Sequence, residues 1–286
     1  MSEVATQRPA RAKRPWIVAN IGATIALIVL TFLVILAIAA PLIAPYPPTA
    51  QDVDNMLSPP TAMHWLGTDD LGRDILSRLI YGAPTTVYAC VLAVGVAVLI
   101  GVPVGLIAGF FGGKVDAVIS RVIDTFLAFP AIVLAIAVTS ALGIGLTNSM
   151  ISVGIVFFPQ LARLVRARTL VVRQDLYVEA ARCFGASPWH ILWRHVLPNT
   201  IQPVIVQVTL LLGTALLAEA SLSFLGLGIQ PPDPSWGAML ARAYQYMEIA
   251  PEQMYSPGLA ILVTALAFNT LGESLRISLD PTSRGR

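Results

Sequence analysis

The amino-acid sequence predicts an all-α membrane protein with six transmembrane helices and with both termini in the cytoplasm. The first observation is composition: 56% of the residues are hydrophobic and only 12% are charged, with a mean hydropathy of +0.75. Soluble domains carry roughly 25% charged residues. The second is that long stretches without charge alternate with charged ones, and a bilayer span needs about 20 mainly apolar residues. The charge-free stretches are 16–51, 79–113, 125–162, 195–218 and 253–272.

The number of spans follows from the charges between these stretches. The third stretch is long enough for two short spans with a turn at 143–148. With six spans, 15 of the 18 basic residues lie on one side, as the positive-inside rule requires of the cytoplasmic side. With five, the arginine-rich stretch 163–194 would face outward. The fifteen are Arg8, Arg11, Lys13, Arg14, Lys114, Arg121, Arg163, Arg166, Arg168, Arg173, Arg182, Arg194, Arg276, Arg284 and Arg286.

The elements can be taken in order along the chain. Residues 1–15 form a basic cytoplasmic tail suited to anionic lipid headgroups. Residues 16–44 are longer than the roughly 7–15 apolar residues of a secretory signal, which favours an uncleaved membrane anchor. Residues 45–83 are expected outside the membrane. Residues 84–276 form the core with five further spans and a cytoplasmic loop at 170–198, and 277–286 form a second cytoplasmic tail.

Small residues recur every four positions along the second span. They are Ala93, Ala97, Gly101, Gly105, Gly109 and Gly113. Such a stripe allows another helix backbone to approach closely. We expect close packing within this chain, with a sliding surface used in transport as the alternative.

The cytoplasmic loop predicts a short helical hairpin. Residues 175–184 favour a helix, and Gly185 can end it because glycine adopts the left-handed conformation at little cost. Ser187 followed by Pro188 is typical of a helix start. The second helix should present an apolar side and end at Pro198. That side comprises Trp189, Leu192, Trp193 and Val196.

The same loop resembles the EAA loop of ABC-importer permeases. That pattern is Glu-Ala-Ala, three residues, Gly, nine residues, an Ile-like residue, any residue, and Leu-Pro. The residues in register are Glu179, Ala180, Ala181, Gly185, Leu197 and Pro198. His195 departs from the Ile-like position, and the neighbouring Val196 would supply the apolar contact. The resemblance implies docking onto an ATPase, whereas the residues alone would also allow a hairpin lying on the membrane surface.

Three further stretches resemble the C-type permease subunit of dipeptide and oligopeptide ABC importers. They lie at 64–82, 224–237 and 269–281, and together with the EAA loop they spread the resemblance over nearly the whole chain after Pro48. The most diagnostic element contains Gly67, Thr68, Asp69, Gly72, Arg73 and Asp74.

This resemblance implies a type I ABC-importer permease fold in the bacterial inner membrane, with no nucleic-acid partner. The implied partners are a B-type permease subunit, two ABC ATPase subunits or domains that bind ATP and Mg, and an extracytoplasmic peptide-binding protein. Peptides are the expected cargo, with nickel chelates, glutathione and haem as alternatives carried by similar permeases.

Two sets of polar residues allow more than one interpretation. His64, Asp69, Asp70 and Asp74 could be metal ligands, but their spacing fits no recognised loop, which favours a structural cap. Glu219 lies near the outer end of the fifth span. A carboxylate there should line the translocation path or pair with a neighbouring helix, because lipid exposure is costly.

Catalytic motifs are absent from the sequence, so we expect no enzyme activity and no cofactor or metal held by this chain. A phosphate-binding P-loop needs Gly-x4-Gly-Lys-Ser/Thr. The only lysines are Lys13 and Lys114, and Val115 follows Lys114. An ion-coupled secondary carrier is the remaining alternative, but it would need carboxylates or broken helices at the membrane midplane.

Overall fold

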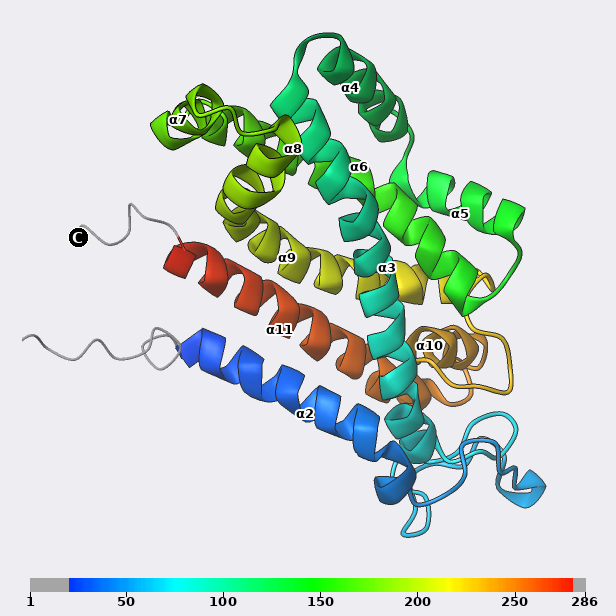
Figure 1. Cartoon of the computed structure of the whole chain (residues 1–286). Helices are drawn as coiled ribbons and strands as arrows, with labels where there is room; N and C mark the ends of the chain where they lie inside the picture. The colour runs from blue at the N-terminus through cyan, green and yellow to red at the C-terminus, as the bar shows by residue number, and fades with distance from the viewer. Residues whose placement is uncertain (1–20, 280–286) are drawn as a thin grey trace, which may run out of the picture.

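A computed structural model describes residues 21–279 of the chain, and this part is helical apart from loops and one isolated β-bridge between Thr68 and Asp74 (Figure 1). The all-α prediction is confirmed for these residues. The α-helices are α2 (Ile21–Ile43), α3 (Ile75–Phe111), α4 (Gly113–Leu127), α5 (Ala131–Leu142), α6 (Leu146–Val172), α7 (Leu176–Cys183), α8 (Pro188–Ile191), α9 (Leu197–Phe224), α10 (Trp236–Gln245) and α11 (Tyr255–Leu279). Three short elements are η1 (Val53–Asn55), a π-helical turn η2 (Leu192–Val196) and η3 (Pro251–Met254).

Five helices in this part of the chain are long and apolar enough to cross a membrane. They are α2, α3, α6, the continuous helix Pro188–Phe224 and α11. A sixth candidate is the pair α4 and α5, which is bent by 95°. Within 125–162 the structure has α5 and the first part of α6, separated by a break at 143–145 inside the predicted turn 143–148, but the first of the two predicted short spans is not a single straight helix. The 12 residues of α5 reach only about 18 Å, against a hydrocarbon core of roughly 30 Å.

The bend between α4 and α5 has a local cause. Pro130 immediately precedes α5, and a residue before proline is pushed out of the helical conformation. The chain around Lys114 and Arg121, between the charge-free stretches 79–113 and 125–162, forms helix α4. Asp116 and Asp124 of α4 form ion pairs with Arg166 and Arg163 of α6, which hold α4 against the bundle.

The two ends of the helical bundle carry different elements (Figure 1). The hairpin of α7 and α8, the first residue of α2 and the last of α11 lie toward one end. The segment 44–74 and α10 lie at the other. Together α4 and α5 lead from the hairpin end to the α10 end. The start of α4 follows Gly109, whose carbonyl accepts a hydrogen bond from Arg173 next to α7. The end of α5 is followed by Gly145, whose N–H donates to the carbonyl of Leu227 in the loop before α10.

The small residues of α3 pack against α6. A methyl group added at Gly105 would lie 2.4 Å from the Ala162 carbonyl oxygen, and one added at Gly109 would lie 2.6 Å from the Thr169 Cβ. Ala93 is fully buried in the same helix. Close packing within the chain is therefore confirmed. Gly113 is an exception, because it begins α4 and faces open space.

The first helix, α2, packs on α3 and α11 through small side chains. Ala23, Ala26 and Ala40 are buried, whereas large apolar side chains such as Ile28 and Phe32 are exposed on its other sides. An exposed apolar surface on a long helix suits contact with lipid. The expected anchor 16–44 thus includes α2, and residues 16–20 lie outside the described part, as do the tail 1–15 and residues 280–286.

The third element, α3, begins earlier than the expected core boundary at 84. Asp74 caps it by accepting a hydrogen bond from the Ser77 backbone N–H at 2.7 Å, so the helix starts at Ile75. The motif from Gly67 to Asp74 therefore leads directly into the first long core helix.

Candidate functional site

The hairpin turns at Gly185, as predicted. Gly185 has φ +78°, its N–H donates to the Arg182 carbonyl at 3.0 Å, and the Ala186 N–H donates to the Ala181 carbonyl at 3.1 Å. This pair of bonds is the Schellman arrangement that ends a helix through a left-handed residue. A Cβ at Gly185 would meet nothing within 4 Å. The glycine is therefore required by the backbone of this chain and not by crowding.

The second hairpin helix starts where expected but does not stop at Pro198. Ser187 accepts a hydrogen bond from the His190 N–H at 3.3 Å, and Pro188 is the first helical residue. The helix then passes through the π turn η2 into α9 without a break. The Leu197 N–H bonds to the Leu192 carbonyl, one residue further back than in an α-helix. Pro198, which has no N–H to donate, is accommodated in the first turn of α9.

The apolar side of the second helix differs from the prediction. Ile191, Leu192 and Val196 are buried, whereas Trp189 and Trp193 are 53% and 51% exposed. The buried residues pack in one cluster with Leu106 and Phe110 at the end of α3, and with Val178 of α7. Tertiary contact with α3 thus selects which apolar face is turned inward.

The EAA residues form an accessible surface on a well-anchored base. Glu179, Ala180, Gly185 and Pro198 are exposed, and Ala181 and Leu197 are half-buried. The base is fixed to the bundle, because Arg173 donates to the Gly109 carbonyl at 2.9 Å and the guanidinium of Arg182 lies 5.5 Å from the Phe110 ring centre.

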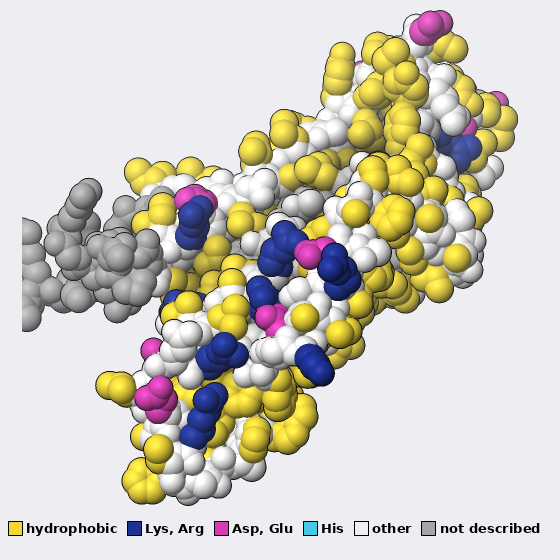
Figure 2. Space-filling view, turned by 90° about the horizontal axis from the view of Figure 1, so that it is seen from above, with side chains coloured by type: hydrophobic (Ala, Val, Ile, Leu, Met, Phe, Trp, Pro, Cys, Tyr) yellow, Lys and Arg dark blue, Asp and Glu magenta, His cyan; other side chains and the backbone are white. Residues whose placement is uncertain are grey.

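Two large apolar side chains beside this surface were missed by the sequence reasoning. Phe184 is 91% exposed and Leu176 is 82% exposed. Apolar side chains exposed at the end of a charged hairpin are typical of a protein-binding surface. Figure 2 looks onto this end of the molecule and shows Lys and Arg side chains gathered among hydrophobic ones. The signal available in the sequence was their position in the EAA loop: Phe184 directly precedes Gly185, and Leu176 lies four residues before Ala180.

The Gly67–Asp74 motif is a compact structural cap. The Asp69 carboxylate accepts hydrogen bonds from the backbone N–H of Leu71 and Arg73 and from Arg73 Nε at 2.7 Å. It also lies 3.5 Å from Arg78 Nε. Asp74 binds Ser77 and His64 Nδ1, the latter at 2.9 Å. These side chains satisfy one another, which supports the structural alternative. Within residues 21–279 no group of three His, Cys, Asp or Glu could hold a metal ion.

The backbone of the motif also explains its glycines and threonine. Gly72 has φ +72°, and a Cβ there would lie 1.7 Å from the Asp52 carbonyl oxygen. Gly67 has φ +78°, with a would-be Cβ 2.4 Å from the Ser58 carbonyl oxygen. The Thr68 hydroxyl donates to the Asn55 carbonyl. These residues fold segment 52–58 tightly over the motif.

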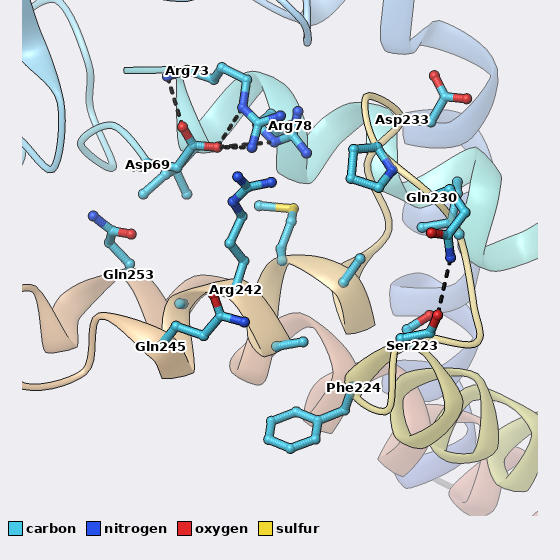
Figure 3. A pocket seen from close by; sticks show the side chains of 18 residues that line it. Asp69, Arg73, Arg78, Ser223, Phe224, Gln230, Asp233, Arg242, Gln245 and Gln253 are labelled. Atoms are coloured by element: carbon cyan, nitrogen blue, oxygen red, sulfur yellow. Dashed lines mark hydrogen bonds and ion pairs between the residues drawn. The ribbon is translucent and has the colours of Figure 1, made fainter. Parts of the chain in front are cut away.

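The motif is joined to α10 across a cavity of about 370 Å³ (Figure 3). Arg242 of α10 donates to Asp70 at 2.6 Å, a bond that raises the pKa of the Arg242 guanidinium. Gln253 donates to the Thr68 carbonyl at 2.8 Å. In Figure 3 the Arg242 side chain rises from α10 toward Asp69 and Arg78. Sequence reasoning did not pair Arg242 with Asp70, 172 residues away.

Glu219 lies inside the chain. Its side chain is fully buried, and its Oε1 accepts a hydrogen bond from the Ser223 hydroxyl at 2.7 Å. Its Oε2 would lie 3.0 Å from a Cβ added at Gly237, in the first turn of α10. A carboxylate is favoured at a helix N-terminus. The carboxylate therefore lies against the start of α10 in this chain, and its buried Oε2 accepts no hydrogen bond from the described residues.

Comparison with known proteins agrees with this architecture. The family model "Binding-protein-dependent transport system inner membrane component" matches residues 101–285, and "N-terminal TM domain of oligopeptide transport permease C" matches residues 17–60. The glutathione transport system permease protein GsiD of Escherichia coli O6:K15:H31 is 47% identical over 93% of this chain and 88% of its own length. The same protein from Shigella boydii serotype 4 gives the same values.

Solved structures of the MetNI methionine ABC transporter in inward-facing conformations share the fold. Two crystal forms align with TM-scores of 0.59 and 0.60 at 20% identity, and cover 72% of this chain and 98% of the matched chain. The five to six apolar helices and the relatives place the chain in the bacterial inner membrane as a multi-pass protein. The chain belongs to the inner-membrane component family of binding-protein-dependent transport systems, as a C-type permease of the peptide ABC-importer kind.

Proposed function

We propose that this chain is the permease subunit of an ATP-driven importer of short peptides, and that it is coupled to its ATPases through the α7–α8 hairpin. The observation that carries the proposal is the hairpin itself. It exposes the EAA residues with Phe184 and is anchored to the ends of α3, α6 and α9. A surface built this way can receive a push from a soluble partner and pass it into the spans.

Glutathione is the first cargo to test. The GsiD relatives are named for glutathione transport, and glutathione is itself a tripeptide. The resemblance of the outer motif to dipeptide and oligopeptide permeases supports the broader peptide class. Nickel chelates and haem are the alternatives within the same family.

The proposed topology has six crossings with both termini in the cytoplasm. It counts the bent pair α4 and α5 as one broken span, supported by the positions of its two ends at opposite ends of the bundle. It places the arginine-rich hairpin inside, as the positive-inside rule favours, and the Gly67–Asp74 motif with α10 outside.

The proposed cycle uses four kinds of partner. A B-type permease completes the path, two ATPase subunits or domains bind the two hairpins, and an extracytoplasmic binding protein delivers the peptide onto the outer cap. ATP binding by the partners would shift the permease pair between two conformations, as a ligand that prefers one state must. This chain contributes no catalytic residue.

The proposal is tested by reconstituting the complex with its partner subunits and binding protein in liposomes. Uptake of labelled glutathione, of dipeptides and of pentapeptides is measured with ATP inside the vesicle compartment that the ATPases face. Peptide uptake that requires ATP and the binding protein is expected. Uptake by this chain driven by a proton gradient without ATPases would favour the ion-coupled carrier, and ATP-dependent uptake of nickel chelate or haem alone would replace the peptide cargo.

A further inference from the structure

A second cavity lies at the hairpin end of the bundle, between α6, α9 and α11, with a volume of about 480 Å³. Its polar lining consists of Arg168 on α6, Gln202 and Gln207 on α9, and Arg276 on α11. Arg168 is four residues before the end of α6 and Arg276 three before the end of α11. Both guanidinium groups therefore lie where the helices leave the apolar part of the bundle.

The two arginines have spare capacity to bind an anion. Nearby, Arg163 and Arg166 form ion pairs with α4, and Arg173 binds the end of α3. Arg168, by contrast, makes no ion pair with any residue of the described part. Among residues 21–279, Arg276 forms an ion pair only with Glu273, at 3.6 Å, and these two side chains are 70% and 55% exposed. An exposed pair of this length contributes little.

Besides the two arginines, the cavity is lined by two glutamines and by apolar side chains. Within residues 21–279, the side chains of Gln202 and Gln207 form no hydrogen bond, so their amides are free to donate. The rest of the cavity is apolar and includes Leu164, Val206 and Leu210. Two cations and two amide donors above an apolar floor match a phosphate group followed by hydrocarbon. Basic pockets between spans at the cytoplasmic surface are suited to anionic headgroups.

We propose that this cavity binds one anionic phospholipid, with its phosphate between Arg168 and Arg276 and an acyl chain along Leu164 and Val206. The leaflet is the one on the hairpin side. Naming that leaflet cytoplasmic rests on the proposed function and its topology, whereas the site itself does not. A free phosphate would use the same guanidinium groups but would leave the apolar floor uncovered, so the lipid is the occupant that uses the whole cavity.

The experiment measures lipid retention on the purified complex by native mass spectrometry after exchange into detergent with phosphatidylglycerol or phosphatidylcholine added. The test variant is Arg168→Gln together with Arg276→Gln. The control is Arg121→Gln, which removes an exposed arginine of α4 at the same end of the molecule. Each arginine near an anionic headgroup contributes roughly fivefold in affinity, so the double variant should bind phosphatidylglycerol about 30-fold more weakly. The control should bind it like the unaltered protein.

Three outcomes would overturn the lipid site. They are equal retention by the double variant, equal retention of phosphatidylcholine, and displacement of the lipid by millimolar inorganic phosphate or by glutathione. The last result would assign the cavity to a free anion or to cargo. Because the readout is lipid mass and not uptake, a complex that transports peptide yet retains no anionic lipid would refute this site and leave the proposed function standing.

Discussion

The backbone conformation of Gly185 allows the coupling role of the hairpin to be tested by adding one methyl group, in the substitution Gly185→Ala. In Gly185→Ala the added Cβ meets nothing within 4 Å, so the only cost within this chain is the left-handed φ of +78°. That conformation costs a non-glycine residue about 1–2 kcal/mol. A cost of this size shifts the equilibrium between the native turn and an alternative turn by about 5- to 30-fold toward the alternative.

Two further substitutions at Gly185 separate the turn from the docking surface. Asparagine tolerates the left-handed conformation, so Gly185→Asn should retain more uptake than Gly185→Ala. Gly185→Arg places bulk and charge on the exposed surface beside Phe184. It should abolish uptake while leaving membrane insertion intact, because the added side chain would stand between the hairpin and the ATPase proposed to bind it.

The assay is ATP-driven peptide uptake into proteoliposomes, divided by the amount of assembled complex, with ATP hydrolysis measured in parallel. We expect uptake to fall several-fold in Gly185→Ala, with a higher number of ATP molecules hydrolysed per peptide. Unchanged uptake in Gly185→Ala would show that the left-handed turn is not needed for coupling. Normal uptake by Gly185→Arg at normal abundance would refute docking at this surface.

Three further predictions concern packing, the buried acid and topology. Gly105→Ala should lower the melting temperature of the complex by several degrees relative to Gly95→Ala. Both gain about 1 kcal/mol in helix propensity, but only Gly105 meets α6, where overpacking costs roughly 1–3 kcal/mol; equal melting temperatures would argue against the tight α3–α6 contact. Glu219→Gln should destabilise the complex without changing uptake per assembled complex, because the carboxylate is buried against α10, and a several-fold loss of uptake at unchanged stability would return it to the translocation path. In a cysteine-free background, a cysteine at exposed Thr49 should react with an impermeant thiol reagent in intact cells, whereas in a Cys90→Ala variant the remaining Cys183 should react only after permeabilisation. Labelling of Cys183 in intact cells would contradict the proposed topology.

The sequence was most informative where structure depends on neighbouring residues. The turn at Gly185 and the helix start at Ser187 and Pro188 depend on local hydrogen bonds and on φ, and both were predicted. The packing of the small residues of α3 was also predicted, because small residues repeated every four positions allow another helix to approach closely.

The errors arose where distant parts of the chain decide. Pro198 was expected to end a helix, but a π turn five residues long carries the helix past it. Trp189 and Trp193 were assigned to one apolar side with Leu192 and Val196, but contact with Leu106 and Phe110 buries Leu192 and Val196 together with Ile191 and leaves the two tryptophans exposed. The two alternatives for Glu219 stayed open in the sequence because its surroundings include α10, whose first turn comes 17 residues later, after a loop that no local pattern positions.

The unbroken helix from Pro188 to Phe224 has a mechanical consequence. Its 37 residues make a rod of about 55 Å. One end of the rod is half of the hairpin, and the other carries Glu219 against α10, which is tied through Arg242 to Asp70. A tilt imposed at the hairpin is therefore transmitted along one continuous helix to the cap formed by the Gly67–Asp74 motif. Coupling between two binding sites is reciprocal. A protein that binds the cap more tightly in one tilt of this helix would therefore change the affinity of the hairpin for its own partner, before any cargo has moved.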